Sequence, residues 1–167
     1  MSLLPDYFFN RITDIAPAFL AARGVKGLVL DIDNTLTFDG QNVLSDEAAR
    51  WLGGIKSAGI EAMIVSNNQV ERGRKFAALC GLPFVAMAFK PSQKTIPDVL
   101  KILAAPPLAI AVIGDQLFTD IRYGKRAGFI TILVEKMGGD LPLFVKMKRV
   151  AERPAMRKLR RNGFTKI

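Results

Sequence analysis

Short apolar runs alternate along this chain with longer polar or amphipathic segments, and this alternation limits the folds open to it. Runs of about five or six apolar residues bounded by turn residues are typical of strands that are buried on both faces. The predicted strands cover residues 25–30, 60–65, 84–88, 109–113 and 129–134. Because strands that alternate with helices are joined by right-handed crossovers, the pattern predicts a parallel sheet with helices on both faces.

The connecting segments carry helix signals that fit this arrangement. Ser45 is a good N-cap for a helix that follows the first predicted strand. Asn68 with Glu71 resembles a capping box for a second helix, which ends at Gly81, and a short helix is expected over residues 120–127. The expected fold class is therefore α/β, a Rossmann-like three-layer sandwich with a central parallel sheet of about five strands.

The residues before the first predicted strand carry an apolar face of their own. Its members are Tyr7, Phe8, Ile12, Ile15 and Phe19. Because Pro17 interrupts this pattern, we expect two short helical pieces that end at Gly24.

Composition removes several classes of catalytic site. Histidine is absent and Cys80 is the only cysteine, which excludes His-dependent triads, His-ligated metals, zinc clusters and an intrachain disulfide. Carboxylates, lysine and hydroxyl groups remain as the available chemistry. The chain shows neither a signal-peptide pattern nor an apolar stretch of about 20 residues, so we expect a cytoplasmic protein.

The net charge of +9 is concentrated at one end of the chain. Residues 143–167, here called the basic tail, hold nine of the 24 Lys and Arg residues and one of the 15 Asp and Glu residues. Residues 1–142 are close to neutral and are predicted to form the folded domain. The tail suits an anionic membrane surface, but it is equally consistent with a solvated helix packed on the domain, and nucleic acid is a third candidate partner.

Polar residues follow four of the predicted strands at the point where each strand ends. Asp31, Ser66, Lys90 and Asp115 lie at these positions. Because the carboxyl ends of parallel strands meet at one edge of the sheet, where such folds bind ligands, these side chains are expected to converge.

Carboxylates at this edge predict a magnesium site. Asp31 and Asp33 are two residues apart, so their side chains point the same way if the strand pleat continues, and Asp115 would add a third carboxylate. Such an oxygen-rich cluster suits Mg²⁺ and a phosphate group. Asp31 could then attack phosphorus, while Asp33 protonates the leaving group and later activates water.

Other polar groups are expected to assist this chemistry. Ser66 and nearby backbone N–H groups could hold phosphoryl oxygens, and Lys90 could offset the charge of the transferring group. Asp120 is placed to orient Asp115 or a metal-bound water. Taken singly, each of these residues also fits an ordinary turn or helix cap, and only their order at one sheet edge favours a catalytic site.

These motifs resemble those of the haloacid dehalogenase-like phosphohydrolases. The segment 31–36, with sequence Asp-Ile-Asp-Asn-Thr-Leu, is similar to their first motif, Ser66 to the second, Lys90 to the third, and 114–120 to the fourth. Within that superfamily the chain looks like the YqeG-type subclass IIIA group, which includes phosphatidylglycerophosphate phosphatases.

The resemblance implies a role for each motif residue. Asp31 is the implied nucleophile and Asp33 the acid and base, with Mg²⁺ held by Asp31, the Asp33 backbone carbonyl and Asp115. Thr35, Ser66, Asn67 and Lys90 are expected to bind the substrate phosphate.

The spacing of the motifs leaves no room for a large inserted cap domain. Because an open site cannot enclose a small metabolite by itself, it favours a phosphate carried by a large object. The expected activity is therefore Mg²⁺-dependent hydrolysis of a lipid head-group phosphate through a phosphoaspartate, with phosphatidylglycerophosphate as the leading candidate. A phosphatase for a soluble or nucleic-acid-terminal phosphate, and a non-catalytic adaptor that binds nucleic acid or ribosomes, are the alternatives.

Overall fold

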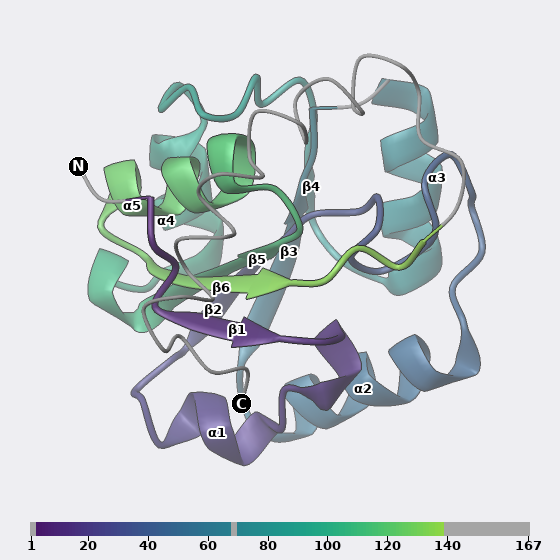
Figure 1. Cartoon of the computed structure of the whole chain (residues 1–167), viewed down its shortest axis with the longest axis horizontal. Coiled ribbons are helices and arrows are strands. Elements are labelled where there is room, and N and C mark those ends of the chain that lie inside the picture. The colour runs from purple at the N-terminus through teal and green to yellow at the C-terminus, as the bar shows by residue number, and fades with distance from the viewer. Residues whose placement is uncertain (1–2, 68–69, 139–167) are drawn as a thin grey trace.

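Six parallel strands form a single sheet at the centre of the structure (Figure 1). The computed structural model describes residues 3–67 and 70–138. The strands are β1 (Tyr7–Phe9), β2 (Gly27–Leu30), β3 (Glu61–Val65), β4 (Phe84–Val85), β5 (Ile110–Gly114) and β6 (Ile130–Val134). Their order across the sheet is β1-β6-β5-β2-β3-β4, and every neighbouring pair is parallel. The expected fold class is confirmed, but the sheet has a strand that the sequence did not predict.

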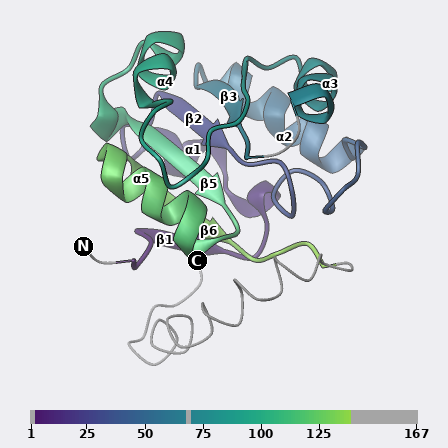
Figure 2. The same ribbon diagram turned by 90° about the horizontal axis from the view of Figure 1, so that it is seen from above.

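Helices cover both faces of this sheet, which makes the three layers (Figure 2). They are α1 (Pro17–Ala21), α2 (Asp46–Ser57), α3 (Val70–Cys80), α4 (Ile96–Leu103) and α5 (Arg122–Ala127). Short 3₁₀ turns precede α1 and β5, and a π-helical turn, η3 (Leu117–Ile121), leads into α5. Helices α1, α2 and α3 pack on one face, and α4 and α5 pack on the other.

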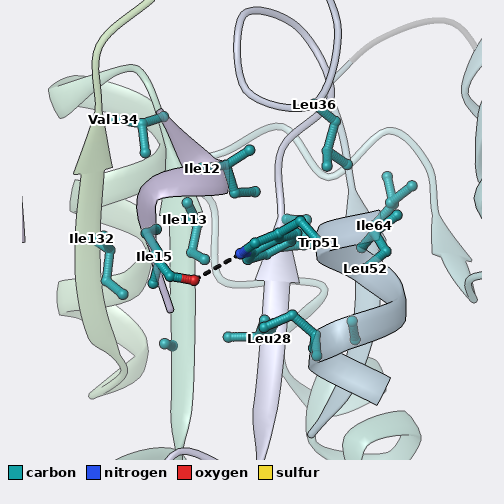
Figure 3. Packing of buried hydrophobic residues seen from close by; sticks show 14 of the residues in the cluster. Ile12, Ile15, Leu28, Leu36, Trp51, Leu52, Ile64, Ile113, Ile132 and Val134 are labelled. Carbon is teal, nitrogen blue, oxygen red and sulfur yellow. Dashed lines mark hydrogen bonds between the residues drawn. The ribbon is translucent and has the colours of Figure 1, made fainter. Parts of the chain in front are cut away.

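Alternating side chains of the buried strands supply both halves of the core. In β2, Leu28 and Leu30 join the apolar cluster under α1, α2 and α3, whereas Val29 joins the cluster under α4 and α5. Trp51 of α2 lies in the first cluster, and its indole N–H donates to the carbonyl oxygen of Ile15 at 2.8 Å (Figure 3). This hydrogen bond satisfies a buried polar group and fixes the N-terminal segment against α2.

The prediction of helical structure around Tyr7 is wrong. Residues 7–9 form strand β1, which extends the sheet by pairing in parallel with β6. Asp6 anchors this strand, because its carboxylate accepts hydrogen bonds from the N–H and hydroxyl groups of Thr131, both at 2.8 Å, and pairs with Lys125. Without β1 the edge of β6 would be unpaired, so a tertiary contact overrides the helical spacing. The second expected helical piece exists as α1, with Pro17 at its first position.

The predictions for the start of α2, the length of β4 and the cap at Asn68 have different outcomes. Helix α2 begins as expected, with the Ser45 hydroxyl accepting a hydrogen bond from the N–H of Ala48 at 3.1 Å. Strand β4 is shorter than predicted and ends at Val85. The expected cap at Asn68 lies outside the described residues.

The segments between the strands that carry the first three motifs are short. Helix α2 alone lies between β2 and β3, and α3 between β3 and β4, within the described residues. The structure therefore has no large cap domain in these segments, as expected from the spacing. The predicted domain limit at residue 142 and the basic tail lie outside the described residues. In the described ranges, none of the helices has the length and apolar character that crossing a membrane requires.

Candidate active site

The carboxyl ends of β2, β3 and β5 bring three buried polar groups to one edge of the sheet. Asp31 follows β2, Ser66 follows β3, and Asp115 follows Gly114 at the end of β5. Each of the three residues is at most 9% exposed. This convergence follows from the parallel topology, because parallel strands end at the same edge of the sheet. The residue after the last apolar position of each strand therefore lies at that edge.

Lys90 lies at the centre of the site. Its ammonium nitrogen donates to Asp31 Oδ1 at 2.7 Å and to Asp120 Oδ1 at 2.6 Å. The side chains of Lys90 and Asp120 are each 1% exposed, whereas that of Asp31 is 12% exposed. Asp31 is therefore the most accessible member of this buried ion network. The buried Lys90 ammonium binds its carboxylate from the protein interior.

Three carboxylates lie close together at this network. Carboxylate oxygens of Asp31, Asp115 and Asp120 all lie within 4.8 Å of one another, and the Lys90 ammonium binds two of these groups, Asp31 and Asp120. Burial raises the pKa of Asp31 to about 7; Lys90 opposes this shift, whereas the Asp120 and Asp33 charges add to it. Burial alone would lower the pKa of Lys90, but Asp120 and Asp31 outweigh it and raise that pKa above its ordinary value.

Asp120 is held in place by the turn on which it lies. Its Oδ2 atom accepts from the Gln116 N–H at 3.2 Å and from the Thr119 hydroxyl at 3.4 Å. Because the π-helical turn η3 folds this segment back over the end of β5, Asp120 lies beside Asp115. The sequence indicated an orienting role for Asp120, and the structure adds its carboxylate to the group that could hold a metal ion.

The Asp33 carboxylate has a different set of partners. Strand β2 ends at Leu30, and a tight turn follows in which the N–H groups of Leu36 and Thr37 both donate to the Ile32 carbonyl oxygen. Asn34 has a left-handed backbone with φ of 58° in this turn, so the strand pleat does not continue through the motif. The Asp33 carboxylate accepts from the Gly40 N–H at 3.1 Å.

Arg72 of α3 also binds Asp33, and no pattern in the sequence identified it. One terminal nitrogen of its guanidinium donates to Asp33 Oδ1 at 2.6 Å and the other donates to Oδ2 at 3.0 Å. The first nitrogen also donates to the Gln41 carbonyl oxygen at 2.7 Å. The hydrogen bond and charge of Asp33 raise the pKa of Arg72. The only signal in the sequence is a basic residue near the start of the helix after the second motif, which many helices share.

The remaining predicted site residues occupy the same edge. Both polar atoms of the Asn67 side chain bind the backbone of Lys90: Nδ2 donates to its carbonyl oxygen at 3.1 Å, and Oδ1 accepts from its N–H at 2.6 Å. Asn67 thus positions the segment that carries Lys90. Thr35 is 1% exposed, and its hydroxyl makes no hydrogen bond within the described residues.

A family model and curated relatives match this chain along most of its length. The model described as "Mitochondrial PGP phosphatase" matches residues 1–137. The probable phosphatase YqeG of Bacillus subtilis is 35% identical over 160 residues, which covers 96% of this chain and 93% of that protein. A phosphatidylglycerophosphate phosphatase 1 of Arabidopsis thaliana, chloroplastic and mitochondrial, is 26% identical over 99% of this chain and 50% of that protein.

Solved structures share the fold at lower sequence identity. An uncharacterised protein from Listeria monocytogenes aligns with a TM-score of 0.57 and 20% identity, over 71% of this chain and 86% of that one. The cobalt-bound form of a deoxy-D-mannose-octulosonate 8-phosphate phosphatase from Haemophilus influenzae aligns with a TM-score of 0.52 and 20% identity, over 75% of each chain. Because the family model covers the strands that carry all four motifs, and YqeG matches nearly the whole chain, this protein belongs to the PGP phosphatase family and is a phosphatase.

Proposed function

We propose that this phosphatase moves the phosphoryl group of a phosphomonoester first to Asp31 and then to water. The observation that carries this proposal is the ion network of Asp31, Lys90 and Asp120 beside Asp115. Lys90 donates a hydrogen bond to Asp31 Oδ1, whereas Asp31 Oδ2 accepts none from the described residues. Oδ2 is therefore the oxygen that would attack phosphorus, and Lys90 would fix the direction of attack.

Asp33 would act as the acid and base in the two steps. It would donate a proton to the leaving alkoxide, and it would later remove a proton from the water that attacks the phosphoaspartate. Its Oδ1 atom accepts hydrogen bonds from the Arg72 guanidinium and the Gly40 N–H, and its Oδ2 atom accepts one from the Arg72 guanidinium. At least one of these bonds would have to open when the substrate binds, so Arg72 would control the orientation of Asp33.

The carboxylate cluster fits a divalent cation, and we propose Mg²⁺. Asp31, Asp115 and Asp120 supply oxygen ligands, which hard cations prefer, and a cation among them would lower the repulsion between their carboxylates. The backbone carbonyl of Asp33 is a further candidate ligand. When bound, the ion would neutralise charge on the phosphoryl oxygens and lower the repulsion between the phosphate and Asp31.

The proposed substrate is phosphatidylglycerophosphate. Two observations support a lipid. The family description and the Arabidopsis relative name PGP or phosphatidylglycerophosphate phosphatases, and the described residues between the motif-bearing strands hold no cap domain. A site without a cap can approach a phosphate that stays in a membrane. We further propose a cytoplasmic enzyme that contacts the anionic membrane face peripherally, aided by the basic tail.

Phosphate release from phosphatidylglycerophosphate tests this proposal. The lipid is presented in detergent micelles and in vesicles, with Mg²⁺, and compared with soluble sugar phosphates, nucleotides and 5′-phosphorylated RNA. We expect turnover of the lipid that is abolished in Asp31→Asn. Faster turnover of a soluble or nucleic-acid phosphate would reject the lipid, and RNA binding without turnover of any substrate would favour an adaptor.

A further inference from the structure

Two large apolar side chains are exposed in the segment that joins β4 to α4. Met87 is 52% exposed and Phe89 is 60% exposed, whereas Ala88 between them is 1% exposed. In Figure 1 this segment runs across the upper edge of the molecule. The segment thus points its smallest apolar side chain inward and its two largest ones toward solvent.

The backbone of this segment is held in an unfavourable conformation. Met87 and Phe89 have φ values of 48° and 47°, in the left-handed region that bulky side chains rarely adopt. Such a conformation is unfavourable for residues other than glycine, and it is often found at functional sites. Neither residue gains core burial from it, although Ala88 between them packs into the apolar cluster under α4 and α5.

The exposed pair lies next to the proposed catalytic lysine. Phe89 directly precedes Lys90, whose backbone is bound by Asn67, and the Ala88 N–H donates to the Ser66 carbonyl oxygen at 3.1 Å. These contacts join the segment to the end of β3, at the same sheet edge as Asp31. Met87 and Phe89 therefore belong to the rim of the candidate site.

Two exposed cations lie on this segment or are bound to it. Lys94 is exposed four residues after Lys90. Arg126 of α5 is also exposed, and it is held against the same segment because its guanidinium donates to the Pro91 carbonyl oxygen at 2.9 Å. Apolar side chains beside basic ones are the composition of surfaces that enter the interface of an anionic bilayer.

We propose that Met87 and Phe89 insert into the interfacial region of an anionic phospholipid bilayer while Lys94 and Arg126 contact its head groups. This inference rests on the proposed lipid substrate and deepens it, because it states how the site meets the surface that carries that substrate. Insertion would place the mouth of the site at the level of the head groups. It would also explain why strained, exposed apolar residues lie beside Lys90.

Phe89→Trp reports insertion directly. The native Trp51 is only 7% exposed and serves as a constant background signal. Vesicles of phosphatidylglycerol and phosphatidylcholine are added to the full chain, and tryptophan emission is compared with and without lipids that are brominated near the carbonyl end of the acyl chains. We expect a blue shift and quenching for Phe89→Trp.

Leu108→Trp is the matched control. Leu108 is 81% exposed and precedes β5, at the opposite edge of the sheet from the site. We expect no blue shift and no quenching for this variant. An unchanged Phe89→Trp spectrum on vesicles that bind the protein would overturn the inference, because the protein would then dock through another surface, such as the basic tail.

Vesicle co-sedimentation gives a second, independent measure. The double variant Met87→Ser and Phe89→Ser should bind phosphatidylglycerol vesicles about tenfold more weakly or worse, because apolar area is no longer buried. Leu108→Ser should bind as the unmodified protein does. Lys94→Gln should weaken binding to anionic vesicles only. Equal binding by all variants would contradict the proposal.

The outcome is separable from that of the proposed function. Insertion is measured without turnover, whereas hydrolysis of phosphatidylglycerophosphate in detergent micelles is measured without a bilayer. Micellar turnover without insertion would reject this inference and leave the substrate assignment intact. Insertion without turnover of the lipid would reject the substrate and leave the membrane contact.

Discussion

The guanidinium of Arg72 holds both carboxylate oxygens of Asp33, at 2.6 Å and 3.0 Å. The Arg72 side chain is 18% exposed and that of Asp33 is 10% exposed, so the pair is largely shielded from solvent. Charged pairs with this bidentate geometry fix orientation as well as charge. Helix α3 therefore determines where the proposed acid and base can point.

Arg72→Ala should lower kcat by about 10- to 100-fold with a smaller effect on KM, because a misoriented acid and base slows the chemical step. Arg74→Ala is the matched control, because Arg74 is exposed on the same helix. Added guanidinium should restore part of the rate in Arg72→Ala only. Equal rates for the two variants would show that Arg72 has no role in positioning Asp33.

Lys90→Met should destabilise the metal-free protein by about 3–5 kcal/mol, because it leaves the buried carboxylates of Asp31 and Asp120 uncompensated. Urea unfolding in the presence of a chelator measures this change. Adding Asp120→Asn to Lys90→Met should recover part of the lost stability, since one of the two uncompensated carboxylate charges is removed. Lys75→Met, which breaks an exposed pair with Glu71, should cost less than about 1 kcal/mol. A loss no larger than that of Lys75→Met would contradict the buried network.

Gly114→Ala should disrupt the site through Asp120. A Cβ atom at position 114 would lie 2.4 Å from Asp120 Cγ, so Asp120 would have to leave its place beside Lys90. We expect weaker divalent cation binding, measured by calorimetry, together with reduced phosphatase activity. Gly53→Ala is the control, because its Cβ would meet nothing within 4 Å and should stabilise helix α2 by about 0.5–1 kcal/mol. Unaltered cation affinity in Gly114→Ala would exclude this contribution of Asp120.

Cation binding should release a proton below neutral pH. Burial raises the pKa of Asp31 from its ordinary value of 3.8 to about 7, so in the metal-free protein this carboxyl is mostly protonated at pH 6 and mostly ionised at pH 8.5. Mg²⁺ must displace that proton, so its affinity should rise with pH up to about 7 and then level off. Calorimetry in buffers of different ionisation enthalpy measures the protons released. We expect close to one proton at pH 6 and few at pH 8.5.

The same titration of Asp31→Asn provides the control for this proton. The amide that replaces the carboxyl group cannot ionise, so the proton release at pH 6 should disappear along with much of the affinity. Proton release that persists in this variant would assign the titration to another group. Chelation should abolish the activity of the unmodified enzyme, and excess Mg²⁺ should restore it.

Much of the fold and of the candidate site follows from the sequence alone. Apolar runs of strand length identify β2, β3, β5 and β6, and alternation with helices fixes their parallel direction. Parallel direction then places Asp31, Ser66 and Asp115 at a single edge. These features are local or topological, so they can be read without knowing how the side chains pack.

Three features depend on contacts between distant segments and could not be predicted. Residues 7–9 have helical spacing, but the open edge of β6 and the contacts of Asp6 make them a strand. Asp33 meets Arg72, 39 positions away, because α3 packs against the turn that follows β2. The Asp120 carboxylate reaches Lys90 because η3 folds back over the end of β5.

Local sequence patterns specify which residues arrive at the carboxyl edge of the sheet, because they encode chain direction and strand ends. The tertiary structure decides which of those charged groups pair with one another. Hydrogen bonds form over about 3 Å, so they depend on packing between segments that are far apart in the chain. For Asp31 this pairing sets the charge state of the site, since Lys90 opposes the effect of burial on its pKa, whereas the neighbouring carboxylates add to that effect.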